Sequence, residues 1–264
     1  MATERSARPT YDDAMAAVFV HGNPETPVIW EPLIAALDRD DTVTVQLPGF
    51  GCDAPQGWAA TMDEYADWLV ARLEEITADS GPVDLVGHDW GSHLGMRAIS
   101  QRPELVTSWV CDSIGALHED YVWHDLAQVW QTEGAGEEFF AGMLALSVQD
   151  RAAGLVAAGV PEPTAARIAT VVDEEMVRCV LALYRSAAQP ALARWGAEIG
   201  PAGTRPGLCI RATDDPYSGG SNLGPLVAKR LGARLAVLEG QGHWWMLTAP
   251  SGAAAVLEAF WSSR

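Results

Sequence analysis

The sequence predicts an α/β protein whose sheet is mostly parallel and covered by helices on both faces. Short apolar segments rich in β-branched residues recur along the chain, and Gly, Pro or Asp bounds each of them. Helix-like segments separate them, and this alternation is typical of parallel sheets, whose strands are buried on both faces. Hydrophobic residues make up 48% of the 264 residues, which is enough for a large core.

The predicted elements follow one another in chain order. Strands are expected at Ala16–Val20, Thr42–Leu47, Val83–Val86, Val106–Cys111, Gly207–Arg211 and Arg234–Leu238. Helices are expected at Trp30–Leu37, Met62–Thr77, Ser92–Gln101, Asn222–Leu231 and Ser251–Trp261.

The segment from Glu119 to Gly200 interrupts the alternation, because it has helical patterns and no strand pattern of comparable quality. Helices are expected there at Glu137–Ser147, Thr164–Gln189 and Ala191–Ile199. An insertion after the strand Val106–Cys111 starts from the carboxyl edge of the sheet, where open α/β sheets bind their ligands. We therefore expect residues 119–200 to form a helical cap over a core made of residues 1–118 and 201–264.

Charge and cysteine spacing exclude several classes of protein. The net charge of −18 repels nucleic-acid phosphates and anionic membranes, so neither is expected as a partner. The cysteines Cys52, Cys111, Cys179 and Cys209 lie too far apart for a zinc motif or a disulfide scaffold. Neither a signal peptide nor an apolar run long enough to span a membrane is visible. These features indicate a cytoplasmic protein.

The sharpest motif is Gly87-His88-Asp89-Trp90-Gly91, which follows the strand Val83–Val86 and precedes a helical pattern. Glycines on both sides allow a tight turn from strand to helix, which exposes the central side chain at the edge of the sheet. This is the geometry of a nucleophile elbow, with Asp89 where serine is usual. In a simpler interpretation Asp89 only caps the following helix.

Three further loops argue against that simpler interpretation. His21-Gly22-Asn23-Pro24 follows the first strand and can direct a main-chain N–H towards the elbow. Asp214-Asp215-Pro216 follows the strand Gly207–Arg211, and Gly242-His243-Trp244 follows the strand Arg234–Leu238. The order nucleophile, acid, histidine along the chain matches that of α/β-hydrolases.

From about Ala16 onward the chain therefore resembles the α/β-hydrolase family, and its aspartate elbow resembles the branch of epoxide hydrolases and haloalkane dehalogenases. The resemblance implies a triad of Asp89, His243 and Asp215. Asp215 is preferred to Asp214 because Asp-Pro followed by an aromatic residue resembles the acid turn of the family. Only 15 residues precede the first predicted strand, so the strands that normally open this sheet are expected to be truncated or rearranged.

An aspartate nucleophile changes the expected chemistry. A carboxylate is ionised at neutral pH, and its attack on a saturated carbon gives an alkyl ester, whereas attack on an acyl group gives a reactive anhydride. Lipase, esterase and peptidase activities are therefore disfavoured. His243, oriented by Asp215, would activate water to hydrolyse the ester, and main-chain N–H groups of Trp90 and Asn23 would hold the oxyanion. We expect no metal and no organic cofactor.

An epoxide oxygen needs an acid when it leaves, and epoxide hydrolases supply that acid from cap tyrosines. The segment Val180–Arg185 resembles the one that carries such a tyrosine, which makes Tyr184 the candidate acid. The position of a second tyrosine falls near Leu126. Nearby side chains that could replace it are Tyr121, Trp123 and His124, and the sequence does not choose among them.

Dehalogenation of an alkyl halide is the alternative. A halide needs N–H donors, and haloalkane dehalogenases use the tryptophan after the nucleophile and often an asparagine, which Trp90 and Asn23 match. Asp112 falls where some dehalogenases place the triad acid, so it is the alternative to Asp215. Epoxide opening is preferred because Tyr184 lies in a longer local match. A ligand-binding member of the fold with weak turnover is a further alternative.

Several side chains are expected to line the substrate pocket: Trp123, Trp130, Trp244 and His124. They favour a small apolar substrate, such as an aromatic or polycyclic epoxide. His88 and His93 are expected to be packing or solvent residues. The sequence leaves open a homodimer and the identity of the final nucleophile.

Overall fold

The structure is a computed structural model that describes residues 15–218 and 223–264. The described residues contain one six-stranded sheet with the order β2-β1-β3-β4-β5-β6. Its strands are β1 (Ala17–Val20), β2 (Thr42–Val45), β3 (Val83–Gly87), β4 (Val106–Cys111), β5 (Gly207–Ala212) and β6 (Arg234–Leu238). All neighbouring strands are parallel, so their carboxyl ends meet at one edge of the sheet.

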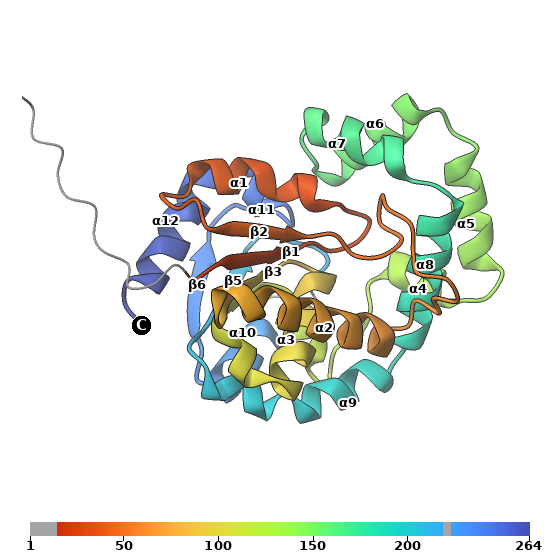
Figure 1. Ribbon diagram of the computed structural model, residues 1–264. Coiled ribbons are helices and arrows are strands. Elements are labelled where there is room, and N and C mark those ends of the chain that lie inside the picture. Colours follow the sequence, from red (N-terminus) through yellow and green to blue (C-terminus); the bar gives the residue numbers. More distant parts are fainter. Residues whose placement is uncertain (1–14, 219–222) are drawn as a thin grey trace, which may run out of the picture.

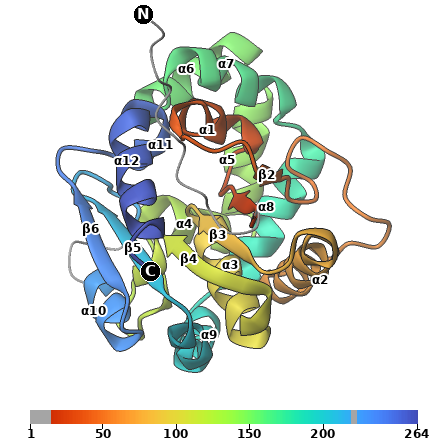
Figure 2. The same ribbon diagram turned by 60° about the vertical axis from the view of Figure 1, so that its left-hand side comes forward.

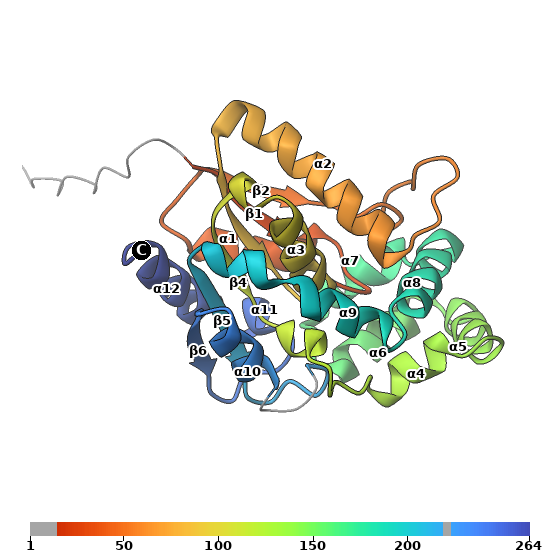
Figure 3. The ribbon, with the colours of Figure 1, turned by 90° about the horizontal axis from the view of Figure 1, so that it is seen from below.

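Helices cover both faces of this sheet (Figures 1 and 3). One face carries α1 (Glu31–Ala36), α11 (Trp245–Thr248) and α12 (Pro250–Trp261), and the other carries α2 (Met62–Ser80), α3 (Trp90–Gln101) and α10 (Leu223–Arg230). Short 3-10 helices connect these elements: η1 (Pro27–Trp30), η2 (Pro103–Leu105), η3 (Ile114–Leu117) and η4 (Gly200–Thr204). The predicted α/β architecture is confirmed.

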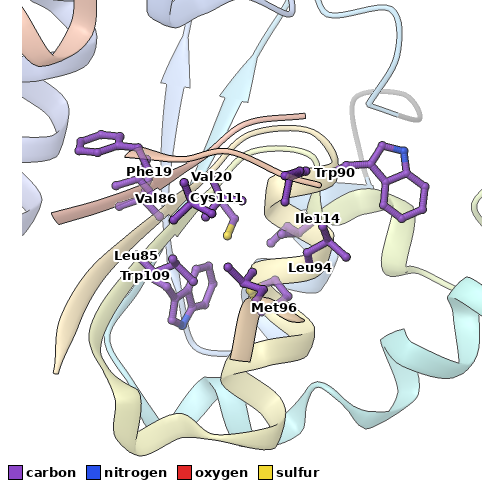
Figure 4. Packing of buried hydrophobic residues seen from close by; sticks show 14 of the residues in the cluster. Phe19, Val20, Leu85, Val86, Trp90, Leu94, Met96, Trp109, Cys111 and Ile114 are labelled. Atoms are coloured by element: carbon purple, nitrogen blue, oxygen red, sulfur yellow. The ribbon is translucent and has the colours of Figure 1, made fainter. Parts of the chain in front are cut away.

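The core lies on both sides of the central strands, because β1 and β3 are buried along their whole length. Phe19 packs against Trp30 on one face, with ring centroids 5.2 Å apart. Leu85, Trp109 and Met96 lie on the α3 side (Figure 4). The strands that lead into the loops at the carboxyl edge are therefore packed on both faces.

Six helices separate β4 from β5; the first five lie beyond the carboxyl edge of the sheet, and the last returns along the α3 side (Figures 1 and 2). They are α4 (Asp125–Gln131), α5 (Ala135–Leu144), α6 (Val148–Ala158), α7 (Glu162–Val171), α8 (Glu174–Ser186) and α9 (Ala191–Glu198), called the inserted helices below. The prediction of one continuous helix over Thr164–Gln189 was wrong. The chain breaks at Asp173, whose carboxylate accepts a hydrogen bond from the Met176 main-chain N–H at 2.8 Å and caps α8.

The expected truncation or rearrangement of the opening strands falls on residues 1–14, which lie outside the described residues, so it stays a prediction. Among the described residues β2 is an edge strand of the sheet. Asn222, the start of one predicted helix, also lies outside the described residues. In the part of the chain that is described, none of the helices has the length and apolar character needed to cross a membrane. The separate cap domain of residues 119–200 stays a prediction.

Candidate active site

Asp89 stands at a sharp turn between β3 and α3. Its backbone has φ 49° and ψ −119°, a conformation that residues other than glycine rarely adopt and that costs about 1–3 kcal/mol. The turn requires its glycines, because a Cβ on Gly91 would lie 2.1 Å from the Val20 carbonyl oxygen. The predicted elbow is therefore present, and the Asp89 side chain remains 14% exposed.

The loop after β1 holds one oxygen of this carboxylate. The Asn23 main-chain N–H donates a hydrogen bond to Oδ2 of Asp89 at 2.9 Å. The loop comes this close because residue 22 is glycine: a Cβ on Gly22 would lie 2.4 Å from the Cβ of Asp89. Oδ2 is fixed in this way, and Oδ1 is left to face the rest of the site.

His243 faces the other carboxylate oxygen. Its Nδ1 is 2.9 Å from Oδ2 of Asp215, and its Nε2 is 4.0 Å from Oδ1 of Asp89. Burial opposes a charge on the ring, but the attraction and hydrogen bond of Asp215, together with the charge of Asp89, outweigh it and raise the pKa of His243 above 6.5. The structure therefore brings together Asp89, His243 and Asp215.

Asp112, the alternative triad acid, does not reach His243. Its Oδ2 lies 2.5 Å from Nδ1 of His88, and its Oδ1 accepts a hydrogen bond from the Asp89 main-chain N–H at 3.0 Å. The Trp245 indole N–H also donates to Asp112. Asp112 thus holds the main chain of the elbow, and Asp215 is the acid that contacts His243.

His88 belongs to a buried charged network that sequence reasoning missed. It lies between Asp112 and Glu25, with Nε2 3.2 Å from Oε1 of Glu25, and none of the three side chains is appreciably exposed. Burial disfavours a charged ring, but the two carboxylates outweigh burial and raise the pKa of His88 well above 6.5. The expectation that His88 is a packing or solvent residue was wrong. It is an imidazolium paired with two carboxylates.

The carboxylates of this network are ionised as a result. Burial alone would raise the pKa of Glu25, but His88 lowers it to about 2, and the same ring holds the pKa of Asp112 far below its ordinary value. The His88 and His243 rings lie 4.4 Å apart, so the imidazolium opposes a second positive charge on His243. Glu25 could have been noticed in the sequence, since it follows the His-Gly-Asn-Pro loop directly.

Glu25, His88 and His243 each offer one potential metal-ligand atom, and these three atoms lie within 4.8 Å of one another. Nε2 of His88 and Oε1 of Glu25 are already hydrogen-bonded to each other, and the Trp244 indole N–H donates to the same Glu25 oxygen at 2.5 Å. A metal ion would have to displace these bonds. The cluster fits a hydrogen-bonded network better than a metal site.

Tyr184 reaches the catalytic centre from α8. The Asn23 side-chain Nδ2 donates to its phenolic oxygen at 3.4 Å, and its ring meets the Trp90 ring edge-on at 5.4 Å. Burial and the charge of Asp89 raise the pKa of Tyr184 well above its usual value of 10, so the phenol stays protonated. Trp90, in the first turn of α3, points away from the other labelled side chains of the core cluster (Figure 4), and its buried indole N–H has no hydrogen-bond partner among the described residues.

Two of the other predicted pocket residues lie against Tyr184, and a third lies beside His243. Trp123 and Trp130 lie with ring centroids 5.2 Å and 4.8 Å from it. Trp244 lies beside His243, at 5.0 Å between ring centroids, but its N–H is engaged by Glu25. His93, expected to be unremarkable, is buried with Nε2 2.9 Å from the Ser113 carbonyl oxygen, which fits a packing role.

The possible substitutes for a second tyrosine differ in what their polar atoms already bind. The Trp123 indole donates to the Ala187 carbonyl at 3.2 Å, and the Tyr121 hydroxyl donates to the Tyr217 carbonyl at 3.3 Å. His124 caps α4, with Nδ1 accepting from the Ala127 main-chain N–H at 3.2 Å. Since Nδ1 is an acceptor and burial lowers the pKa of His124, its proton resides on Nε2.

Comparison with known proteins fits this geometry. Residues 17–256 match the family model described as the alpha/beta hydrolase family. The chain belongs to this family. This α/β-hydrolase therefore shares its fold with enzymes that place a nucleophile, an acid and a histidine on the same three loops.

Individual relatives are similar over part of the chain. A cis-3-alkyl-4-alkyloxetan-2-one decarboxylase of Shewanella oneidensis is 32% identical over 106 residues, which is 38% of this chain and 33% of that protein. A haloalkane dehalogenase of Bradyrhizobium diazoefficiens is 30% identical over 97 residues, or 36% of this chain and 30% of that protein. The matches thus span about a third of each curated relative.

The crystal structure of haloalkane dehalogenase DbeA from Bradyrhizobium elkani superposes with a TM-score of 0.73 at 20% identity, covering 96% of this chain and 92% of that one. At this identity the superposition supports the fold alone, and the reaction has to be inferred from the site residues.

Proposed function

We propose that this α/β-hydrolase opens an epoxide through a covalent alkyl-enzyme ester on Asp89 and then hydrolyses that ester. In the first step Oδ1 of Asp89 attacks a ring carbon, the carbon–oxygen bond of the epoxide breaks, and the ring oxygen takes a proton from a side chain opposite Asp89. The inserted helices carry that acid and exclude bulk water. No metal or organic cofactor is required by this chemistry.

The Tyr184 hydroxyl carries the proposal. Asn23 Nδ2 donates to its oxygen, so the phenolic hydrogen is free to point to a substrate oxygen. The same Asn23 donor stabilises the phenolate that remains after proton transfer. Because the pKa of Tyr184 is raised, the hydroxyl is a fully protonated acid at neutral pH.

His124 supplies the second donor in this proposal. Its Nε2–H is not engaged by any described side chain, whereas Tyr121 and Trp123 donate to main-chain carbonyls. His124 lies near enough to Asp89 and His243 for their charges to affect its pKa. Two neutral donors, the phenol and the imidazole N–H, can then hold one epoxide oxygen.

The second step uses the triad. Alkylation removes the negative charge of Asp89, which otherwise helps to raise the pKa of His243, so formation of the ester lowers the pKa of His243 and favours its neutral, basic form. Water held by His243 gives a proton to the imidazole and attacks Cγ of Asp89. The Cγ–Oδ1 bond then breaks, His243 returns its proton to the departing alkoxide to give the diol, and the second water proton restores the Tyr184 hydroxyl. The oxyanion develops on Oδ2. The main-chain N–H of Asn23 already donates to this oxygen, and the main-chain N–H of Trp90 can also donate to it.

Variant kinetics test the proposal. Aromatic epoxides, 1-bromoalkanes and a 3,4-dialkyl oxetan-2-one are offered to wild type, Tyr184→Phe and His124→Phe. Tyr184→Phe is expected to slow epoxide opening about 10²- to 10⁴-fold. His124→Phe is expected to slow it less, and neither variant should slow halide release. Epoxide turnover unchanged in Tyr184→Phe contradicts the proposal.

Dehalogenation is the second candidate, and the unpartnered Trp90 indole N–H favours it. With Asn23 Nδ2 this N–H makes a pair of donors suited to a halide. If this is the reaction, halide release survives Tyr184→Phe and falls in Asn23→Ala and Trp90→Phe. Diol formation without halide release from any substrate of the panel excludes it.

A further inference from the structure

We propose that Glu25 is a positioning residue, which holds the loops of Asn23, Asp89 and His243 in the places that the proposed reaction needs. The inference rests on the proposed function, because it takes these three residues as the reacting groups. Glu25 acts through their neighbours in the sequence, and its side chain is only 1% exposed. Burial opposes its ionisation, but His88 lowers the pKa of Glu25 to about 2, so it is a carboxylate at neutral pH.

One oxygen of Glu25 holds the loop after β1. The main-chain N–H of Gly22 donates a hydrogen bond to Oε2 of Glu25 at 2.8 Å. Gly22 precedes Asn23, whose main-chain N–H donates to Oδ2 of Asp89. Hydrogen bonds to an ionised acceptor are roughly twice as strong as those between neutral groups. Oε2 therefore fixes the chain directly before the proposed oxyanion donor.

The other oxygen joins the elbow to the loop of the histidine. Oε1 of Glu25 lies 3.2 Å from Nε2 of His88 and accepts a hydrogen bond from the indole N–H of Trp244 at 2.5 Å. His88 precedes Asp89, and Trp244 follows His243. A single buried oxygen is therefore bonded to the neighbours of both the proposed nucleophile and the proposed base.

These bonds bear on the distance of 4.0 Å between Nε2 of His243 and Oδ1 of Asp89. The two residues are far apart in the sequence, so the distance depends on contacts between their loops. Asp112 already holds the main chain of the elbow, and Glu25 ties the other two loops to it. Displacement of a reacting group by about 1 Å can cost about 10²-fold in rate. Loss of the Glu25 carboxylate should therefore slow turnover even in molecules that remain folded.

Two variants and a matched control separate positioning from general stability. Glu25→Met removes every acceptor of the side chain, because methionine is unbranched and of similar length but has no oxygen. Trp244→Phe is milder and removes only the indole donor. The control is Asp84→Asn, since Asp84 is also a buried carboxylate, bonded to Ser108 at 2.7 Å and to Arg264 at 2.9 Å. It lies at the end of β3 opposite the elbow.

Hydrogen exchange of the full chain without substrate measures how firmly the loops are held. In Glu25→Met the amides of residues 21–25 and 242–246 are expected to lose protection, whereas in Asp84→Asn they should keep it. In Trp244→Phe only residues 242–246 should lose protection, and this variant decides if Glu25→Met does not fold. Loss confined to residues 21–25 in Glu25→Met, or no loss in Trp244→Phe, overturns the inference.

Kinetics test whether these bonds matter for the reaction. Single-turnover hydrolysis of the ester, measured at the pH of its maximum, is expected to fall about 10²-fold in Glu25→Met and to stay near the wild-type rate in Asp84→Asn. The double variant Glu25→Met/Trp244→Phe should be no slower than Glu25→Met, since the indole has already lost its acceptor. Equal rates in Glu25→Met and Asp84→Asn overturn the inference. If no substrate of the panel forms an ester, the proposed function fails, and the exchange result alone decides the role of Glu25.

Discussion

Nε2 of His243 lies 4.0 Å from Oδ1 of Asp89, beyond hydrogen-bonding distance but close enough for one water molecule to contact both residues. A direct ion pair with His243 would hold Oδ1 of Asp89 and make it a weaker nucleophile. The separation instead leaves Oδ1 available for a substrate carbon and later admits the hydrolytic water. The main-chain N–H of Asn23 sets this separation, because it holds Oδ2 on the side of the carboxylate away from His243.

The missing side chain at Gly22 should be essential for this arrangement. Gly22→Ala introduces a Cβ 2.5 Å from Oδ2 of Asp89, so the carboxylate must move. We expect turnover to fall about 10²-fold, because displacement of a reacting group by about 1 Å has that effect. The control is Gly142→Ala in α5, where a Cβ meets nothing within 4 Å. Equal activity of both variants would contradict the role of the loop.

The pH dependence of ester hydrolysis reports the state of His243. Burial lowers the pKa of His243 and the attraction of Asp215 raises it, so single-turnover hydrolysis should increase with pH through a midpoint that follows the pKa of His243. Asp215→Asn removes this attraction and should lower both the midpoint and the maximal rate. Asp214→Asn is the matched control, since Asp214 bonds to Thr213 and not to His243. The account fails here if the two variants have the same midpoint.

The buried network should contribute to stability with a defined pH dependence. The folded-state pKa of Glu25 is about 2 against 4.5 when unfolded, so its contribution of about 3 kcal/mol is complete above pH 4.5 and is lost as the pH falls towards 2. Urea unfolding of wild type and Glu25→Gln should therefore differ most at neutral pH and converge in acid. Glu31→Gln, which removes an exposed ion pair with Arg167, should change stability by less than about 1 kcal/mol.

The parallel sheet and the grouping of Asp89, His243 and Asp215 could be predicted because each depends on local patterns in a fixed order. Strand periodicity located β4 and β6 at their observed bounds, and Gly-flanked motifs located Asp89 and His243. The pairing of side chains across loops could not be predicted. Asp112 could have contacted either His88 or His243, and only packing of β3 against β4 decides for His88.

The charged network escaped prediction for the same reason. Glu25 is 63 residues from His88, and His88 is 24 residues from Asp112. A buried acid has no local signature, since its ionisation depends on partners that the fold supplies. The break at Asp173 is different: an aspartate before Glu-Glu-Met is a readable N-cap, and that signal was available in the sequence.

Mass spectrometry of intact His243→Ala after incubation with substrate tests the central claim most directly. Without its base the enzyme should accumulate the ester, with the mass of the whole epoxide added, or of the haloalkane less hydrogen halide. Peptide mapping should place the added mass on Asp89, and the double variant Asp89→Asn/His243→Ala should gain none. Turnover by wild type with no adduct in His243→Ala, or an adduct on another residue, would contradict the account.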